Sequence, residues 1–209
     1  MDTYWNSRFI KEQMIWGTGP SRIALISEKI FHEYNLKTII IPGAGYGRNG
    51  KYFTEHGYRV DGIEISPEAI RIGKEFAPSI NYIEGSVLDT FPDKKYDAVF
   101  CYDLIHLFKN HERKIIIENC LSFSRSKGLI MISCFSDKDK TFGTGREIEE
   151  NTFEVKPGKT VHFFTEHEMG NIHPGLNPVK INHLIEKIKT PEREDAYCLR
   201  YGIYEKIRD

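Results

Sequence analysis

A glycine-rich turn between two apolar runs is the stretch of this chain best suited to hold a ligand. The turn contains Gly43, Ala44, Gly45 and Gly47, and it follows the apolar run at residues 38–42. Glycine lets backbone N–H groups approach a ligand closely, and a helix predicted after the turn would direct its positive N-terminus to the same place. The pattern predicts a site for a nucleotide-like cofactor at the edge of a parallel sheet.

A carboxylate at the end of the next apolar run supports this interpretation. Glu64 closes the run at residues 59–64 and stands 21 residues after Gly43 (64 − 43), which is about where an acid that binds ribose hydroxyls is expected. The other interpretation is a surface acid at a strand end. A dinucleotide fingerprint would place a third glycine three residues after Gly45, but Arg48 stands there. This difference counts against a nicotinamide-dependent oxidoreductase, which remains an alternative.

Apolar runs and helical patterns alternate along the chain, so they predict the elements that hold these residues. We expect strands at residues 38–42, 59–64, 80–84, 96–102 and 129–135. Helices are expected to begin after Ser21, near Arg48, after Ser66 and after Asn110. Continuous apolar strands separated by helices indicate an α/β fold with a doubly wound, mostly parallel sheet covered on both faces.

The last third of the chain has a different pattern. Residues 136–160 are polar and contain glycine, which predicts a long loop over the site. Thr165 and Glu168 form a capping-box pattern that opens a short helix. Residues 196–207 alternate like a strand, whereas residues 179–187 fit either a strand or a helix.

Composition limits the function classes. The 209 residues suit one domain, 40% are hydrophobic, 28% are charged and the formal net charge is −1, which argues against a dedicated nucleic-acid surface. No apolar run approaches the ~20 residues that cross a bilayer, and the N-terminus shows no secretory pattern. The four cysteines form no Cys-x-x-Cys pair and no zinc-ligand spacing, so we expect reduced cysteines, no metal and a cytoplasmic location.

Further motifs resemble those of one family. After Gly43–Gly47 and Glu64 come the segments 84–89 (Glu-Gly-Ser-Val-Leu-Asp) and 96–102 (Tyr-Asp-Ala-Val-Phe-Cys-Tyr), in the order found in class I S-adenosylmethionine (SAM) dependent methyltransferases. The N-terminal residues Trp5, Arg8 and 16–21 resemble the segment that folds over the cofactor in the group that includes thiopurine and tellurite-resistance methyltransferases. The resemblance implies a Rossmann-like methyltransferase fold with a seven-stranded sheet, a single domain over residues 1–209, and residues 1–21 as an N-terminal lid.

Two positions depart from the family's pattern. An acidic residue often precedes the first glycine, and this chain has Pro42 there. The residue after Gly85 is commonly aspartate, and here it is Ser86. Both differences bear on how the amino and adenine ends of SAM are held.

The resemblance implies a role for each candidate site residue. Arg48 would pair with the SAM carboxylate or would be a solvated arginine of the first helical turn, and Asn49 would contact the cofactor or the helix backbone. Ser86 and Val87 would lie beside the adenine. The expected cofactor-binding residues are Trp16, Gly43, Ala44, Gly45, Gly47, Arg48, Asn49, Glu64, Ile65, Ser86, Val87 and Tyr102.

Two residues after the fourth predicted strand are expected at the methyl-transfer centre. The ring of Tyr102 would stabilise the sulfonium by cation–π attraction, or it is a core aromatic. His106 would contact the substrate or act as a base, or it is a packed histidine. Asp103 and His162 are weaker candidates of the same kind, and Arg146 is either a contact for an anionic substrate or solvated.

The expected reaction is methyl transfer from SAM to a small molecule. Because no strong candidate for a general base is evident, a soft nucleophile such as a thiol or a chalcogen oxyanion is favoured. Alternatives are the nicotinamide-dependent oxidoreductase, a non-catalytic SAM-binding protein, and a methyltransferase acting on protein or RNA. We expect no nucleic-acid or membrane partner, and a monomer or homodimer.

Overall fold

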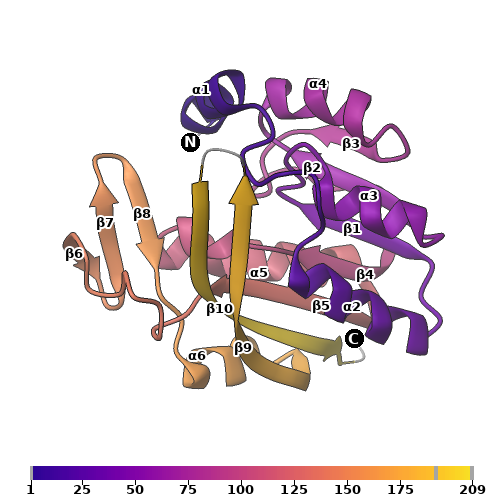
Figure 1. Cartoon of the computed structure of the whole chain (residues 1–209). Helices are drawn as coiled ribbons and strands as arrows, with labels where there is room; N and C mark the ends of the chain where they lie inside the picture. The colour runs from indigo at the N-terminus through magenta and orange to yellow at the C-terminus, as the bar shows by residue number, and fades with distance from the viewer. Residues whose placement is uncertain (1, 191–192, 208–209) are drawn as a thin grey trace.

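The computed structural model describes residues 2–190 and 193–207 (Figure 1). The elements, in chain order, are α1 (Asp2–Glu12), α2 (Arg22–Glu33), β1 (Thr38–Pro42), α3 (Arg48–Glu55), β2 (Arg59–Glu64), α4 (Pro67–Phe76), β3 (Asn81–Glu84), β4 (Tyr96–Cys101), the 3₁₀ helix η1 (Ile105–Leu107), α5 (Asn110–Phe123), β5 (Ser124–Phe135), β6 (Arg146–Glu149), β7 (Thr152–Lys156), β8 (Lys159–His162), α6 (Glu166–Gly170), β9 (Leu176–Thr190) and β10 (Arg193–Lys206).

A seven-stranded sheet forms the centre of the molecule, in the order β3-β2-β1-β4-β5-β10-β9 (Figure 1). The first five strands of that order are parallel, and β10 pairs antiparallel with both β5 and β9. The predicted doubly wound, mostly parallel α/β sheet is therefore confirmed. Three predicted strands shift at their ends: β3 begins at Asn81, β4 ends at Cys101, and β5 begins at Ser124.

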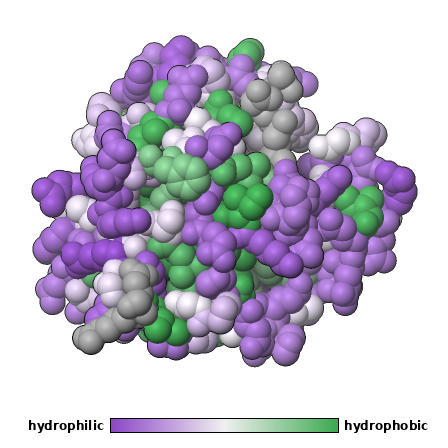
Figure 2. Space-filling view, turned by 180° about the vertical axis from the view of Figure 1, so that it is seen from behind, coloured by the Kyte–Doolittle hydropathy of each residue, from purple (hydrophilic) through white to green (hydrophobic). Residues whose placement is uncertain are grey.

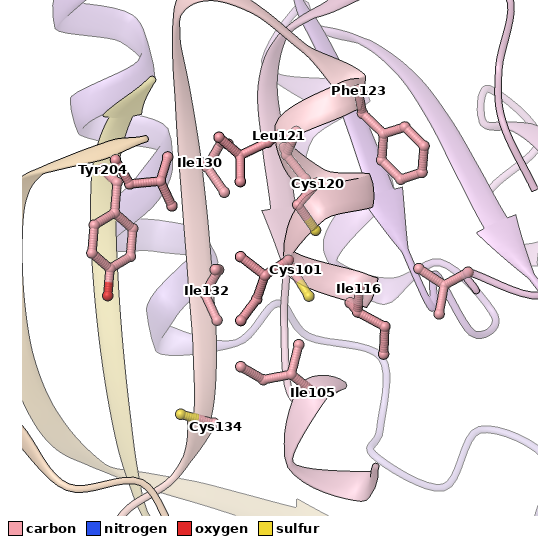
Figure 3. Packing of buried hydrophobic residues seen from close by; sticks show 14 of the residues in the cluster. Cys101, Ile105, Ile116, Cys120, Leu121, Phe123, Ile130, Ile132, Cys134 and Tyr204 are labelled. Atoms are coloured by element: carbon pink, nitrogen blue, oxygen red, sulfur yellow. The ribbon is translucent and has the colours of Figure 1, made fainter. Parts of the chain in front are cut away.

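Side chains alternate between two hydrophobic cores, one on each face of the sheet. In β1, Ile39 and Ile41 pack with α2 and α3, whereas Ile40 packs on the face covered by α5. Figure 3 shows the second core, where Ile116 of α5 lies near Cys101 of β4. A strand buried on both faces is mostly apolar, which is why β1 appears in the sequence as a continuous apolar run. Each fully buried isoleucine stabilises the fold by about 1.5–3 kcal/mol.

Helix starts follow the predicted capping residues. The Ser21 and Ser66 side chains accept hydrogen bonds from the third backbone N–H of α2 and α4, and Thr165 with Glu168 forms the predicted capping box of α6. A neutral cap of this kind is worth about 1 kcal/mol. These caps fix where α2 and α4 begin beside the glycine turn.

The prediction of a long loop at residues 136–160 is wrong. The segment contains β6 and β7, and with β8 these form a separate three-stranded antiparallel sheet. Phe153 and Val161 are buried in it, together with Phe163. The strands have only four or five residues and lie between polar turns, so their few apolar positions gave too short a pattern to detect. The small sheet projects from one side of the molecule in Figures 1 and 2.

The end of the chain forms a long hairpin. The ambiguity at residues 179–187 is resolved as a strand, because β9 pairs with β10 along its length.

Among residues 2–190 and 193–207, no helix combines the length and apolar character that a membrane crossing needs. Apolar side chains show through the middle of the face in Figure 2, between mostly hydrophilic ones.

The order of the strands defines where a ligand can bind. The chain runs from β1 outward to β2 and β3, then returns to the other side of β1 to form β4. The connections after β1 and β4 therefore leave the sheet in opposite directions. In open α/β sheets this switch point opens a crevice at the carboxyl ends of the two strands.

Candidate active site

A pocket of about 1260 Å³ lies at this switch point. Its floor is the glycine turn after β1 and the residues that follow β2, β3 and β4. The expected cofactor-binding residues and His106 all line it, namely Trp16, Gly43, Ala44, Gly45, Gly47, Arg48, Asn49, Glu64, Ile65, Ser86, Val87, Tyr102 and His106. Its volume exceeds the upper end of the usual ligand pocket, about 1,000 Å³, so it has room for a cofactor and a second molecule.

The glycine turn has a backbone conformation that residues other than glycine adopt only at a cost in free energy. Gly43, Gly45 and Gly47 have φ angles of 67°, 56° and 84°, in the left-handed region that favours glycine. A Cβ on Gly47 would also meet the Tyr82 hydroxyl at 2.3 Å and a methyl of Ile80 at 2.6 Å. The turn is therefore set both by its conformation and by close packing on the strand and helix behind it.

Glu64 is buried beside that turn, with 6% of its surface exposed. Its Oε2 accepts a hydrogen bond of 2.7 Å from the Gly45 N–H, and its Oε1 accepts one of 2.9 Å from the Ser66 N–H. Burial raises the pKa of this carboxyl, and the hydrogen bonds from Ser66, Gly45 and Ile65 lower it. Among the described residues no cation pairs with it, and three N–H donors leave part of its acceptor capacity unused. These acceptor oxygens fit a ligand that presents hydroxyl groups, such as the ribose of SAM.

The loop after β3 is held from the opposite side of the pocket. Asn119 of α5 donates hydrogen bonds to the carbonyls of Val87 and Leu88, at 2.8 and 3.2 Å. The Ser86 hydroxyl accepts a bond from the Leu88 N–H, so it closes the local turn while it lines the pocket. Ser86 keeps its O–H donor for a ligand.

Arg48 and Asn49 tie the N-terminal segment to the glycine turn. Arg48 is buried and donates to the carbonyl oxygens of Trp16 and Gly19, at 3.2 and 3.4 Å. Asn49 accepts the Ser21 N–H at 2.8 Å. Neither side chain is solvated. Arg48 uses some of its five N–H donors on the protein and lines the pocket with the rest, so its predicted pairing with a ligand carboxylate stays a prediction.

The N-terminal segment lies at the mouth of the pocket. Trp16 stacks on Tyr46, with ring centroids 6.1 Å apart and planes at 16°. Asn6 of α1 accepts hydrogen bonds from the Ser66 hydroxyl and the Glu68 N–H, which fixes α1 against α4. Trp16 is thus packed against the turn and also lines the pocket.

Tyr102 lies directly after β4. Its ring is stacked on Phe100, at 5.9 Å and 7°, and its hydroxyl accepts a hydrogen bond from Arg48 at 3.3 Å. Burial, and then the nearby Asp103, raise the pKa of the phenol well above its usual value. The residue therefore presents a neutral aromatic group at the inner end of the pocket.

His106 lies in η1 and is buried, with 4% of its surface exposed. Its Nδ1 has no hydrogen-bond partner among the described residues, and its ring is 4.8 Å from that of Phe135. Burial, and then Lys159 and His162, lower its pKa to about 3. The imidazole is therefore neutral and a weak base near neutral pH, which suits hydrogen bonding to a substrate better than proton removal.

Two of the weaker candidates, His162 and Arg146, lie outside the pocket. His162 bonds Thr152 and Glu168, at 2.7 and 3.0 Å, and so has a structural role between β7, β8 and α6. Arg146 pairs with Glu154 outside the main pocket. Over the described ranges, no group of three or more His, Cys, Asp or Glu side chains is placed to hold a metal ion.

Three elements surround the outer half of the pocket: α1, the closed end of the β7–β8 hairpin, and the β9–β10 hairpin (Figure 1). They contribute the cations Arg8, Lys156 and Lys159, and the aromatic ring of Tyr197 lies 5.3 Å from that of Phe135. Burial, and then Arg8 and Lys156, lower the pKa of Lys159. The inner half is thus lined by the glycine turn and Glu64, and the outer half by aromatic rings and by charged side chains of both signs, which include Glu12 and Asp195.

Asp103 is a functional candidate that the sequence ranked too low. It lines the pocket next to Tyr102, and burial raises the pKa of its carboxyl to about 7. Its φ of 49° is in the left-handed region, which is uncommon for a residue other than glycine. No pattern in the sequence marks either property, because both depend on contacts with other strands.

Comparison with known proteins agrees with this geometry. Residues 41–132 match a methyltransferase domain family. A ubiquinone biosynthesis O-methyltransferase of Rickettsia akari is 26% identical over 155 residues, which cover 70% of this chain and 61% of the relative. The chain therefore spans less than two thirds of the length of that curated relative.

Solved structures share the fold over almost the whole chain. One comes from work on the conversion of a disulfide bond into a thioacetal group during echinomycin biosynthesis; it is 16% identical, has a TM-score of 0.78, and the match covers 99% of this chain and 92% of the other. A second is 1,6-didemethyltoxoflavin-N1-methyltransferase of Burkholderia thailandensis, bound to its substrate and S-adenosylhomocysteine, at 18% identity, a TM-score of 0.70 and coverage of 98% and 88%.

The strand order and the pocket at its switch point are those of the Rossmann-like methyltransferase fold, and the region that matches a methyltransferase domain family runs from the end of β1 into β5.

Proposed function

We propose that this chain transfers a methyl group from SAM to a small molecule bound in the outer half of the pocket. The observation that carries the proposal is the buried Glu64 carboxylate, bonded to the N–H of Gly45 and without a cation partner among the described residues. Its oxygens already accept backbone N–H groups, and their remaining lone pairs can accept the hydroxyl groups of a ligand such as ribose. The two methyltransferases named above support a small-molecule acceptor.

Each site residue then has a proposed role. The turn from Gly43 to Gly47 holds the amino-acid end of SAM, with Arg48 near its carboxylate. Glu64 binds the ribose, while Ile65, Ser86 and Val87 surround the adenine. Asn49 and Trp16 keep the N-terminal residues 1–21 over the cofactor as a lid on the single domain. When SAM is bound it supplies an electrophilic methyl on a sulfonium, which the ring of Tyr102 stabilises.

The proposed acceptor is a soft nucleophile, a thiol or a chalcogen oxyanion. Work on a structural neighbour concerns sulfur chemistry, which supports a sulfur acceptor. The curated relative is named as an O-methyltransferase, and this favours a hydroxyl as the second candidate. In both cases the protein aligns the two reactants in a pocket that excludes water.

Calorimetry with SAM and with NAD tests the cofactor, and a screen of thiols, selenite, tellurite and phenols tests the acceptor, with release of S-adenosylhomocysteine as the signal. We expect SAM to bind and NAD not to bind. NAD binding without SAM binding would overturn the proposal. Tight SAM binding with no release for any acceptor would support the alternative of a non-catalytic SAM-binding protein.

A further inference from the structure

Asp103 is held rigidly at the inner end of the pocket by the neighbouring strand. Its backbone N–H donates to both the carbonyl and the hydroxyl oxygen of Ser133, each at 3.1 Å. The same hydroxyl donates back to Oδ1 of Asp103, at 3.3 Å. Ser133 is fully buried in β5. These bonds hold Asp103 in its left-handed backbone conformation, a kind of strain that is often found at functional sites.

Charged groups face this carboxyl from several elements. Burial is the largest influence on the pKa of Asp103 and raises it; Arg48 of α3 lowers it, and Glu186 of β9 raises it. Hydrogen bonds with Ser133 and Tyr102 also lower it, and the resulting pKa is about 7. Glu186 is itself buried, and its carboxylate accepts the Arg22 N–H at the start of α2. Asp103 is therefore a carboxylate that can gain or lose a proton near neutral pH.

The other titratable side chains at the inner end of the pocket are poorly suited to accept a proton near neutral pH. The pKa of His106 is about 3, the pKa of Tyr102 is well above its usual value, and Glu64 is engaged with the glycine turn. A general base works best when its pKa is near the operating pH. In the region where β4 ends, Asp103 meets this condition.

We propose that Asp103 accepts the proton of the attacking group during methyl transfer, so that the acceptor enters as a neutral thiol or phenol. The inference rests on the proposed function and narrows its substrate class. The S–H or O–H bond of the acceptor breaks, and its proton moves to the Asp103 carboxylate. The freed electron pair forms the bond to the methyl carbon, and the pair of the broken carbon–sulfonium bond returns to sulfur, which leaves S-adenosylhomocysteine.

The acidity and the charge of a molecule decide whether Asp103 can activate it as a methyl acceptor. Thiols and phenols have pKa values of about 8.5 and about 10, within reach of such a base, whereas water-like hydroxyls lie near about 15.7. An oxyanion such as selenite brings its own negative charge toward Asp103 and needs no base. The rings of Phe135 and Tyr197 and the unpartnered Nδ1 of His106 line the adjoining part of the pocket, where an aromatic thiol or phenol can pack.

The test is Asp103→Asn in the whole chain, assayed with phenols and thiols of graded acidity across a range of pH. We expect kcat to fall by about 10²–10⁴-fold for acceptors that are neutral at the assay pH, and by much less for those already ionised. The rise of the wild-type rate as the pH passes through the pKa of Asp103 should disappear. The SAM dissociation constant should stay within about twofold, which separates this inference from the proposed function.

Glu186→Gln provides a second test that leaves Asp103 in place. Removing the negative charge of Glu186 should lower the pKa of Asp103 and move the midpoint of the pH–rate profile to lower pH, with little change in the maximal rate. An equal loss in Asp103→Asn for ionised and neutral acceptors would indicate a structural role and overturn the inference. An unshifted midpoint in Glu186→Gln would do the same, even if Asp103→Asn proved too unstable to assay.

Discussion

The N–H of Gly45 and the carboxylate of Glu64 are joined by a hydrogen bond of 2.7 Å, although Gly45 follows β1 and Glu64 is the last residue of β2. The bond links the glycine turn after β1 to the end of β2 and fixes their relative position at the floor of the pocket. It places the acid where it can accept donors from a ligand without a further rearrangement.

Replacing Glu64 by alanine should weaken SAM binding by about 1–3 kcal/mol, because ribose hydroxyls would lose their acceptors. The matched control is Glu84→Ala: Glu84 is the residue of β3 that pairs with Glu64 in the sheet, but it is exposed and lies outside the pocket. Calorimetry should show a weaker SAM affinity in the first variant and no change in the second. An unchanged dissociation constant in Glu64→Ala would remove this residue from the site.

Gly47→Ala should destabilise the fold more than Gly57→Ala. Both glycines have nearly the same φ, 84° and 85°, so both substitutions carry the same cost for placing alanine in the left-handed conformation. A Cβ at position 47 meets Tyr82 and Ile80 below 3.0 Å, whereas nothing lies within 4 Å at position 57. We expect Gly57→Ala to cost about 1 kcal/mol and Gly47→Ala about 1–3 kcal/mol more. Urea unfolding measures both, and equal losses would show that packing behind the turn is unimportant.

Asn49→Ala should release the N-terminal segment from the pocket mouth. The Ser21 N–H would lose its acceptor in a buried position, at a cost of about 1–3 kcal/mol. Hydrogen exchange of residues 16–21 should accelerate, and SAM should dissociate faster if the segment acts as a lid. The exposed Asn177→Ala is the control. Faster exchange with an unaltered SAM off-rate would contradict the lid.

His106 should make the ligand-free protein less stable in mild acid. Its pKa falls from 6.5 to about 3 on folding, so between those values the unfolded chain binds more protons. The contribution of His106 to stability is therefore fully present above the pKa of the unfolded state, 6.5, and is lost as the pH falls below it. From about pH 7.5 to about pH 5 the loss from this residue is about 2 kcal/mol.

The contribution of His106 has to be measured as the difference between the wild type and a His106 variant. The titration of Asp103 changes the stability in the opposite direction over the same pH range. The pKa of Asp103 is raised from 3.8 to about 7 on folding, so its contribution to stability decreases as the pH rises. We expect the free energies of unfolding of the wild type and His106→Asn to converge by about 2 kcal/mol between the two pH values. A constant difference would show that His106 is not buried in its neutral form.

The sequence predicted the fold and the cofactor half of the site because both depend on local patterns. The strands β1 and β2 were placed at the correct residues: β1 by its apolar run, and β2 by its place between Gly57 and the Glu64 carboxylate. The glycine turn and Glu64 were recognised by spacing alone. Their assignment to SAM remains a proposal until ligand binding is measured.

What could not be predicted depends on contacts between distant segments. Asp103 gains its unusual pKa from burial and from Arg48 and Glu186, which are far away in the sequence. The partners of Arg48 are two backbone carbonyl oxygens and the Tyr102 hydroxyl; all three lie far from it in the sequence, so no local pattern shows them. The β6–β8 sheet was missed because its strands are too short for periodicity to distinguish them from loop.

The burial of all four cysteines has a practical consequence for assays. Cys101, Cys120, Cys134 and Cys198 are all buried, and none forms a disulfide. Common reducing agents are thiols and would compete as methyl acceptors if the proposed substrate class is correct. With its own thiols shielded from oxidants and from mixed-disulfide exchange, the protein can be handled in buffers free of such agents. Background turnover can then be separated from turnover of the added acceptor.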